Sequence, residues 1–153
     1  PGVIFDEAIV DGYPGIKINE HTNLIAFDID DKEAKLGKRP FELTNLSQEF
    51  RSFVIDQDSY MEYSPSRCGL RILMTCEEKS DLPGRVNLLK EKCIGGELFI
   101  NYRYVTVKVK QINDEKIKPI TKYNLKTWYM PSKTETCVDI PINYKPPDLP
   151  LVL

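Results

Sequence analysis

A chain of 153 residues with 41% hydrophobic and 10% aromatic side chains is expected to fold as one domain with a substantial core. Its net charge of -2 is not that of a strongly basic nucleic-acid-binding protein. No apolar run approaches the roughly 20 residues of a membrane span, and the start lacks the basic and then apolar pattern of a signal peptide. These features predict an intracellular protein without a membrane partner.

The cysteines and the histidine argue against a structural zinc site. Cys68, Cys76, Cys93 and Cys137 are irregularly spaced, and His21 is the only histidine, so no zinc-ligand pattern is present. Reduced thiols are favoured over two disulfides. The chain starts with Pro and Gly rather than Met, which is typical of a piece of a longer protein.

The first half of the chain predicts a hairpin, a loop and a helix. Gly15–Ile18 and Leu24–Asp30 have the composition of strands joined by a short turn. Residues 31–41 are charged and contain Gly and Pro, so a loop is expected there. Apolar residues then recur at helical spacing and predict a helix over residues 44–54, capped by Thr44 or Asn45, that covers one face of a sheet.

The second half predicts further strands. Tyr60–Tyr63 and Leu70–Thr75 are expected to be strands on either side of a turn-rich connection, and a short helix is expected near Val86–Lys92. Glu97–Ile100 and Tyr102–Val109 are again β-prone.

These elements predict an α+β fold, with a mixed or antiparallel sheet and helices packed on one side. The folded domain is expected to span residues 1–140, and the Pro-rich residues 141–153 are expected to form a tail or linker.

An acidic pair ends the most apolar predicted strand. Asp28 and Asp30 follow Leu24–Phe27 and alternate with Ile29, so both side chains lie on one face, about 6.6 Å apart along the backbone. At an effective dielectric of about 20, two such charges repel by roughly 2.5 kcal/mol. Solvation or a hard divalent cation such as Mg²⁺ would relieve that repulsion. A strand that simply ends in a polar turn is the alternative. The second D-x-D sequence, Asp56-Gln57-Asp58, is interpreted as a turn between a helix and a strand.

Two further segments carry polar groups next to strands. The connection from Ser64 to Gly69 contains Ser66 and leads to Arg71, so it has the small residues and the guanidinium that hold phosphate in other proteins. Glu97 follows a Gly pair at the start of a strand. Taken alone, the first segment is an ordinary polar loop with a surface arginine, and Glu97 is an exposed acid.

Charge is unevenly distributed along the chain. Residues 1–62 carry about twice as many acidic as basic side chains. Residues 101–133 are basic, with Arg103, Lys108, Lys110, Lys116, Lys118, Lys122, Lys126 and Lys133. The first part suits metal ions and the second suits phosphate, although a solvated lysine face would look the same.

The order of these segments resembles the archaeo-eukaryotic-type primases, in particular the primase-polymerase domains of phage, plasmid and virus replication proteins. The resemblance covers roughly residues 5–109 and includes Phe27–Asp30, Tyr63–Ile72, Glu97–Phe99 and Arg103–Val107. Arg67 replaces the first loop glycine of the family pattern, and Arg71 replaces its frequent histidine. The segment before the first acid is also short for the family, which is consistent with a shortened N-terminal module.

The resemblance implies an RRM-like palm, two Mg²⁺ or Mn²⁺ ions on Asp28, Asp30 and Glu97, and template-directed nucleotidyl transfer by a two-metal mechanism. Ser66, Arg71 and Arg103 would contact the nucleoside triphosphate. The other expected partners are a single-stranded or primed DNA template and a helicase domain or protein. The basic residues 101–133 would follow the template.

Two other functions stay open. One is a catalytically inactive primase-polymerase-like module for DNA binding or assembly, and the other is an unrelated metal-dependent nuclease, phosphotransferase or structural viral protein. The two-metal interpretation makes a geometric prediction: the carboxylates of Asp28, Asp30 and Glu97 should converge within a few ångströms, with Arg71 facing the same cleft, and it fails if Glu97 lies on the opposite face of the sheet. Asp31 and Glu91 are the alternative metal ligands.

Overall fold

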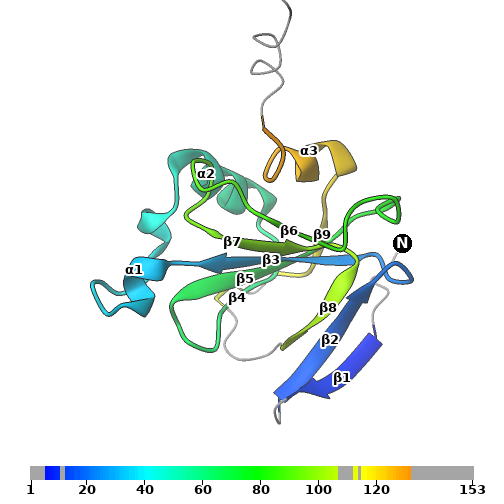
Figure 1. Ribbon diagram of the computed structural model, residues 1–153, viewed down its shortest axis with the longest axis horizontal. Coiled ribbons are helices and arrows are strands. Elements are labelled where there is room, and N and C mark those ends of the chain that lie inside the picture. Colours follow the sequence, from blue (N-terminus) through cyan, green and yellow to red (C-terminus); the bar gives the residue numbers. More distant parts are fainter. Residues whose placement is uncertain (1–5, 11–12, 107–111, 114, 132–153) are drawn as a thin grey trace, which may run out of the picture.

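Two antiparallel sheets and three short helices make up the computed structural model, which describes residues 6–10, 13–106, 112–113 and 115–131 (Figure 1). The strands are β1 (Asp6–Val10), β2 (Tyr13–Asn19), β3 (Leu24–Asp30), β4 (Met61–Tyr63), β5 (Gly69–Thr75), β6 (Arg85–Asn87), β7 (Gly96–Phe99), β8 (Tyr102–Thr106) and β9 (Lys118–Pro119). The helices are α1 (Lys32–Lys35), α2 (Gln48–Gln57) and α3 (Lys122–Lys126), with a 3-10 turn η1 (Leu43–Asn45). The chain is therefore α+β.

β3 lies at the centre of the larger sheet. The strand order is β4-β5-β3-β7-β6, with each neighbouring pair antiparallel, and β9 adds a short parallel pairing to β5. β3 is hydrogen-bonded to a strand on each side, and its first four residues are buried. A strand buried in this way is expected to be apolar, as the sequence LIAFDID is. The predicted strand over Leu24–Asp30 and the predicted mixed or antiparallel sheet are confirmed.

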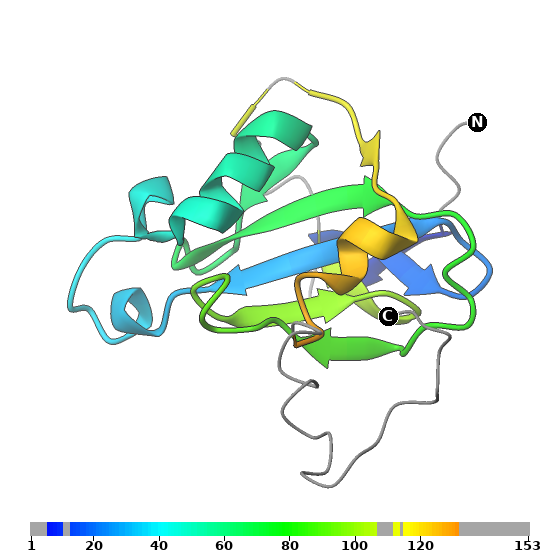
Figure 2. The ribbon, with the colours of Figure 1, turned by 90° about the horizontal axis from the view of Figure 1, so that it is seen from above.

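One face of this sheet carries the main core. Ile25, Phe27 and Ile29 alternate along β3 and are buried against α2 and α3. The Phe27 ring centroid lies 5.8 Å from that of Phe50 on α2, and the Phe50 centroid lies 5.0 Å from that of Trp128. Figures 1 and 2 show α2 and α3 over the same face, so the predicted packing of helices on one side is confirmed.

The helix predicted over residues 44–54 starts and ends later, at Gln48 and Gln57. Ser47, not Thr44 or Asn45, is the cap, because its hydroxyl accepts a hydrogen bond of 3.1 Å from the Phe50 N–H. Asp58 closes the helix in the left-handed region at φ 46°, where aspartate is among the better-tolerated residues. The interpretation of Asp56-Gln57-Asp58 as a helix end and turn is confirmed.

A small sheet with the order β1-β2-β8 lies on the other side of the larger sheet (Figure 1). A second core joins the two sheets, formed by Ile16, Ile18, Leu24, Ala26, Leu73, Phe99 and Val105. Leu24 and Ala26 share a face with Asp28 and Asp30, since side chains alternate along a strand. The small sheet therefore covers the first half of β3 on this face, and the acidic half lies beyond that core.

Three local predictions are wrong. The expected hairpin between residues 15–18 and 24–30 does not form, because β2 pairs with β1 and β8, whereas β3 pairs with β5 and β7. The helix expected near Val86–Lys92 is replaced by β6, an edge strand of three residues, followed by turns. The expected loop 31–41 contains α1, which Asp31 caps.

The remaining strand predictions are confirmed within a residue or two by β4, β5 and β7, and β8 confirms the strand from Tyr102 as far as Thr106. The rest of that strand, the predicted tail 141–153 and Cys137 lie outside the described residues. Cys68, Cys76 and Cys93 are free thiols. Within the described ranges, no helix has the length and apolar character needed to cross a membrane.

Candidate active site

A row of polar residues crosses the larger sheet on the face away from α2. In register from β4 to β6, the row consists of Glu62, Arg71, Asp28, Glu97 and Asn87. Paired residues of antiparallel strands have their side chains on the same face, about 4.5–5.5 Å apart at Cβ. We call these five residues the polar row. Asp28 lies at its centre, between an arginine and a glutamate.

The row forms where the apolar pattern of three strands stops together. One register step earlier, Ala26 pairs with Leu73 and Phe99, and all three are buried in the second core. The next positions on that face are charged in every strand, and Asp30 follows on β3. The polar row therefore borders the covered half of the sheet, and its acids Asp28 and Glu97 are only partly buried.

Two glycines allow the neighbouring strands to approach Asp28 and Asp30 closely. Gly69 pairs with Asp30, and a Cβ at Gly69 would lie 1.8 Å from the Ile29 carbonyl oxygen. A Cβ at Gly96, where φ is +120°, would lie 2.1 Å from the Asp28 carbonyl oxygen. Any other residue at either position would push the strands apart. The Gly pair before Glu97 therefore has a structural reason, which is the close β3–β7 contact.

Each predicted metal-binding acid has a basic neighbour. Arg71 Nη2 lies 3.2 Å from Asp28 Oδ1, and Arg85 Nε lies 3.7 Å from Glu97 Oε2. Lys35 Nζ of α1 lies 3.0 Å from Asp30 Oδ1. The side chains of Asp30 and Glu97 are 35% and 36% exposed, against 22% for Asp28 and 11% for Arg71. Asp28 and Arg71 thus form the inner part of the site, with the other two acids nearer to solvent.

The electrostatic environment disfavours the charged form of Asp28. Burial raises the pKa of its carboxyl group, and the nearby charges of Asp30 and Glu97 raise the pKa further. Arg71 lowers it by charge and by a hydrogen bond, but the net shift is upward. The three acids are therefore close enough to interact, and a bound cation would favour the ionised form.

The donor set suits a hard divalent ion, because it consists of carboxylate oxygens from adjacent strands. In the present arrangement these oxygens are turned toward basic side chains. Among the described residues, no group of three or more His, Cys, Asp or Glu side chains is gathered closely enough to hold a metal ion. Binding would therefore require Lys35 and Arg85, both half-exposed, to release Asp30 and Glu97.

The three predicted nucleotide-binding residues occupy different places. Arg71 is in the polar row and donates to Asp28. Ser66 is exposed in the β4–β5 connection, where its hydroxyl accepts a hydrogen bond of 3.3 Å from the Cys68 N–H. Arg103 is on β8 of the small sheet, with its guanidinium 5.2 Å from the centroid of the Phe99 ring. The structure thus brings Arg71 next to the acids, with Ser66 in the loop at the Asp30 end of the sheet.

Asp31, one of the two alternative metal ligands, is part of the scaffold. Its side chain is buried, caps α1 and accepts two hydrogen bonds of 3.1 and 3.0 Å from Arg39. Burial raises the pKa of this carboxyl group, but the hydrogen bonds from Arg39 and Ala34 and the Arg39 charge outweigh that effect, so the pKa lies below its usual value. Asp31 anchors the chain immediately after the acidic pair.

Sequence reasoning missed Glu62, Arg85 and Asn87. Arg85 and Asn87 lie on β6, where a helix was expected. Their pairing next to Glu97 could therefore not be predicted from the sequence. Glu62 is fully buried on β4 opposite Arg71. The sequence did carry a signal for Glu62. It lies between Met61 and Tyr63 on an expected strand, and alternation could have placed its side chain on the same face of the sheet as Arg71.

A groove of about 580 Å³ opens at the Asp30 end of the row, bordered by Asp30 and Glu97 together with Lys32, Arg39 and Lys90. It therefore offers both acidic oxygens and basic groups at one opening, as an ion together with a phosphate would require.

The basic segment 101–133 does not form one surface in the described residues. Arg103 lies on β8, whereas Lys122 at the start of α3 is bound to Asp81, and Lys118 is bound to Glu115. α3 packs on the face opposite the polar row. Lys108, Lys110 and Lys133 lie outside the described residues.

No family model matches this chain, and the curated proteins compared with it contain no match either.

Proposed function

We propose that this chain is a primase-polymerase-like domain that joins nucleotides on a nucleic-acid template during replication of a mobile element or virus. The observation that carries the proposal is the polar row, in which Asp28 lies in register between Arg71 and Glu97, with Asp30 two residues further on the same face. Three strands from separate parts of the sequence contribute to this arrangement, which an isolated acidic turn would not require.

The strand order supports an RRM-like palm. β3 leads into α2, then β4 and β5 return as a hairpin, and β7 pairs with the free side of β3. In an RRM-like sheet the first strand likewise lies between the third and the last, with the second at the edge and the helices on one face. In this chain β6 and turns stand where the second helix of that fold would be.

Asp28, Asp30 and Glu97 are the residues that would hold two Mg²⁺ or Mn²⁺ ions. When bound, such ions activate the attacking hydroxyl and neutralise the triphosphate and its leaving group. Burial and the neighbouring charges of Asp30 and Glu97 together raise the pKa of Asp28, and this unfavourable environment of the carboxylate is the energetic reason for the site to accept cations. Phosphoryl transfer demands position and charge more than covalent chemistry from the protein, and the polar row supplies both.

Arg71 has a positioning role in this proposal. Its side chain is only 11% exposed and its guanidinium is bound to Asp28, so Arg71 orients that carboxylate from the next position along the row. More exposed groups would contact the triphosphate, namely Ser66 in the β4–β5 connection and Arg85 beside Glu97.

Primer extension tests the proposal. Wild-type protein with a primed DNA template, labelled nucleotides and Mn²⁺ should yield extended product. Asp28→Asn and Asp30→Asn should each lower the rate by about a hundredfold or more, as expected when a charge that organises the transition state is removed. The matched control is Asp56→Asn with Asp58→Asn, since this second D-x-D pair ends α2 away from the row. Equal activity of the Asp28 variant and the control would refute the site.

One observation favours a second function, an inactive primase-polymerase-like module that binds DNA or assembles a replication complex. Each acid of the proposed metal site is held by a basic side chain at 3.0–3.7 Å. A protein in which these ion pairs never open would bind DNA without adding nucleotides. Template binding that Mn²⁺ and nucleotides leave unchanged, with no product at any enzyme concentration, would establish this second function.

A further inference from the structure

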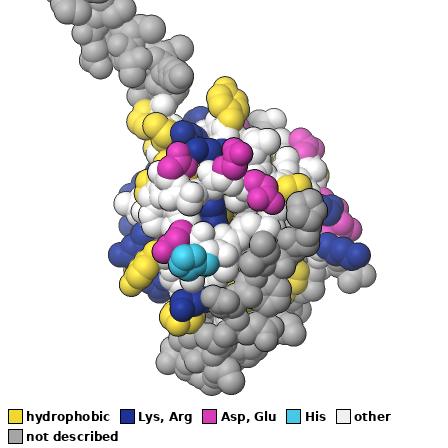
Figure 3. Space-filling view, turned by 90° about the vertical axis from the view of Figure 1, so that its right-hand side faces the viewer, with side chains coloured by type: hydrophobic (Ala, Val, Ile, Leu, Met, Phe, Trp, Pro, Cys, Tyr) yellow, Lys and Arg dark blue, Asp and Glu magenta, His cyan; other side chains and the backbone are white. Residues whose placement is uncertain are grey.

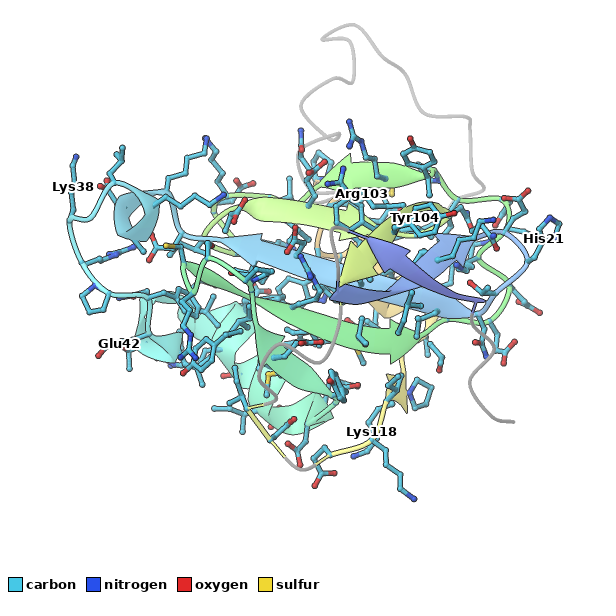
Figure 4. All side chains as sticks on the ribbon, turned by 90° about the horizontal axis from the view of Figure 1, so that it is seen from below. His21, Lys38, Glu42, Arg103, Tyr104 and Lys118 are labelled. Carbon is cyan, nitrogen blue, oxygen red and sulfur yellow. The ribbon has the colours of Figure 1, made fainter. Side chains whose placement is uncertain are left out.

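A second groove, of about 600 Å³, runs beside the polar row between the small sheet and β6. Its notable side chains are Lys17, Arg85, Arg103, Tyr102 and Tyr104, with Glu20 at one end. We call it the tyrosine groove. Figure 4, a view from the side of the small sheet, shows Arg103 and Tyr104 near one another. The described part of the groove therefore combines aromatic rings with three cations and one acid.

The two tyrosines are unusually exposed for their size. Tyr102 is 63% exposed and Tyr104 is 46% exposed, so neither ring is used in the core of the described structure. They are two residues apart on β8, opposite Asn19 and Lys17, and therefore point to the same face of the small sheet. Two rings side by side on a strand are a platform on which unpaired bases stack.

The cations lie around these rings. Lys17 Nζ is 5.9 Å from the centroid of the Tyr104 ring, at the outer limit of a cation–π contact, so the ammonium does not cover the ring tightly. Arg103 has φ of 138°, a backbone region that residues other than glycine rarely adopt. Despite this cost, Arg103 is exposed and lines the groove, and its guanidinium lies 5.2 Å from the centroid of the Phe99 ring. Strain of this kind is typical of positions kept for binding.

Arg85 lies between the tyrosine groove and the candidate active site. This residue lines the groove and also lies 3.7 Å from Glu97 of the polar row. The β2–β3 turn and the loop after β5, at the other end of β3, instead expose acidic side chains around His21 (Figure 3). A polyanion on this protein would therefore meet favourable charge in the groove and repulsion at that end.

We infer that the tyrosine groove binds single-stranded nucleic acid, with bases stacked on Tyr102 and Tyr104 and phosphates held by Lys17, Arg85 and Arg103. The inference deepens the proposed function, because it names the path by which an unpaired strand would reach the polar row. Binding itself needs no metal ion or nucleotide, since stacking and phosphate contacts act on the strand alone. The surface can thus be tested separately from catalysis.

The test is the fluorescence anisotropy of a labelled oligothymidylate titrated with the protein in EDTA. Tyr102→Ala and Tyr104→Ala should each weaken binding about tenfold, the loss expected when one base loses its stacking partner. Tyr104→Phe should bind like wild type, because a phenyl ring still stacks. The matched control is Tyr123→Ala on α3, which removes a tyrosine that is 81% exposed but lies away from the groove.

Salt dependence tests the cations. Each phosphate contact contributes about 0.7 to the slope of log affinity against log salt on a single strand, so Lys17→Ala and Arg103→Ala should each reduce the slope by about that amount. Lys116→Ala, which removes an exposed lysine outside the groove, should leave it unchanged.

Equal binding of duplex and single strand, or unchanged binding by the Tyr→Ala variants, would overturn the inference. Either result would leave primer extension as an independent test of the polar row. Conversely, groove-dependent binding without any extension product would support the inference while the proposed catalysis fails.

Discussion

Asp28 is held in an environment that opposes its charge, and this makes it the residue where stability and function conflict most directly. Burial and the neighbouring acids Asp30 and Glu97 raise the pKa of its carboxyl group, and only Arg71 counteracts them. In the unfolded chain the pKa returns to its ordinary value. Between the two pKa values the folded protein binds more protons, so the free energy of unfolding falls as the pH rises through that window. Above both pKa values the destabilisation is fully present.

Replacing Asp28 with Asn should therefore stabilise the metal-free protein at neutral pH. We expect a gain on the order of 1 kcal/mol, typical of substitutions that relieve strain in a functional site, or about 2–4 °C in the melting temperature of a domain of this size. Thermal unfolding in EDTA measures it. Mn²⁺ should raise the melting temperature of the wild type and not of Asp28→Asn, because only the former binds the ion through the row. A variant less stable than wild type in EDTA would show that Asp28 serves the fold through Arg71.

At the scale of elements, the pairing of β3 with β7 depends on a glycine. A Cβ at Gly96 would lie 2.1 Å from the Asp28 carbonyl oxygen, at a φ of +120°. Backbone rather than a flexible side chain opposes it, so the strands would have to separate. This pairing also places Glu97 opposite Asp28, which ties the stability of the sheet to the geometry of the row.

Gly96→Ala should consequently destabilise the protein by about 3 kcal/mol or more, from steric overlap combined with a disfavoured φ. Urea unfolding measures the change. Gly37→Ala is the matched control, because Gly37 also has a positive φ, +74°, but nothing lies within 4 Å of its Cβ position. That variant should lose only about 1 kcal/mol. Equal losses in both variants would mean that backbone conformation, and not the β3–β7 contact, accounts for the effect at Gly96.

Elements with a strong local pattern could be predicted from the sequence. β3 and β5 contain apolar runs long enough to predict buried strands, and the apolar residues of α2 recur at helical spacing. β6 could not be predicted, because an edge strand of three residues such as Arg85–Asn87 buries little and is specified by its pairing with β7. For the same reason the hairpin expected before β3 was wrong, since a short turn does not determine whether two strands share a sheet.

The candidate site was predictable in its acids and less so in its bases. Asp28 and Asp30 could be named because alternation places both on one face, whereas Glu97 was named because the family resemblance and a two-metal site call for a third carboxylate. That Arg71 would be buried against Asp28, or that Arg85 would reach Glu97, depends on strand register. Register is set by long-range pairing rather than by local composition.

At the scale of the whole molecule, a single buried lysine joins the two sheets. Lys79, only 3% exposed, donates from Nζ to the carbonyl oxygens of Asn19 at the end of β2, Leu24 at the start of β3, and Ile100 after β7. The chain passes from one sheet to the other at these points. Lys79 thus satisfies backbone groups where sheet pairing stops, which otherwise would be costly to bury.

Lys79→Met should destabilise the protein by about 2–3 kcal/mol at neutral pH, because three carbonyl groups lose a donor. The pH dependence of this stability loss is a more specific test of the role of Lys79 than its size at neutral pH. Burial lowers the pKa of Lys79 from 10.5 to about 8 in the folded protein, so between these values the unfolded chain binds more protons. The free energy of unfolding should then rise with pH over this range.

Urea unfolding of wild type and Lys79→Met at several values between pH 7 and 10.5 isolates this contribution, since the other titrating groups are common to both proteins. The stability difference in favour of wild type should grow as the pH rises, because the wild type no longer has to bury an ammonium charge, while a neutral amine still donates to carbonyl oxygens. A difference that stays constant with pH would mean that the three carbonyl dipoles keep Lys79 charged. In that case the two sheets would be joined by a buried cation at every pH at which the protein is folded.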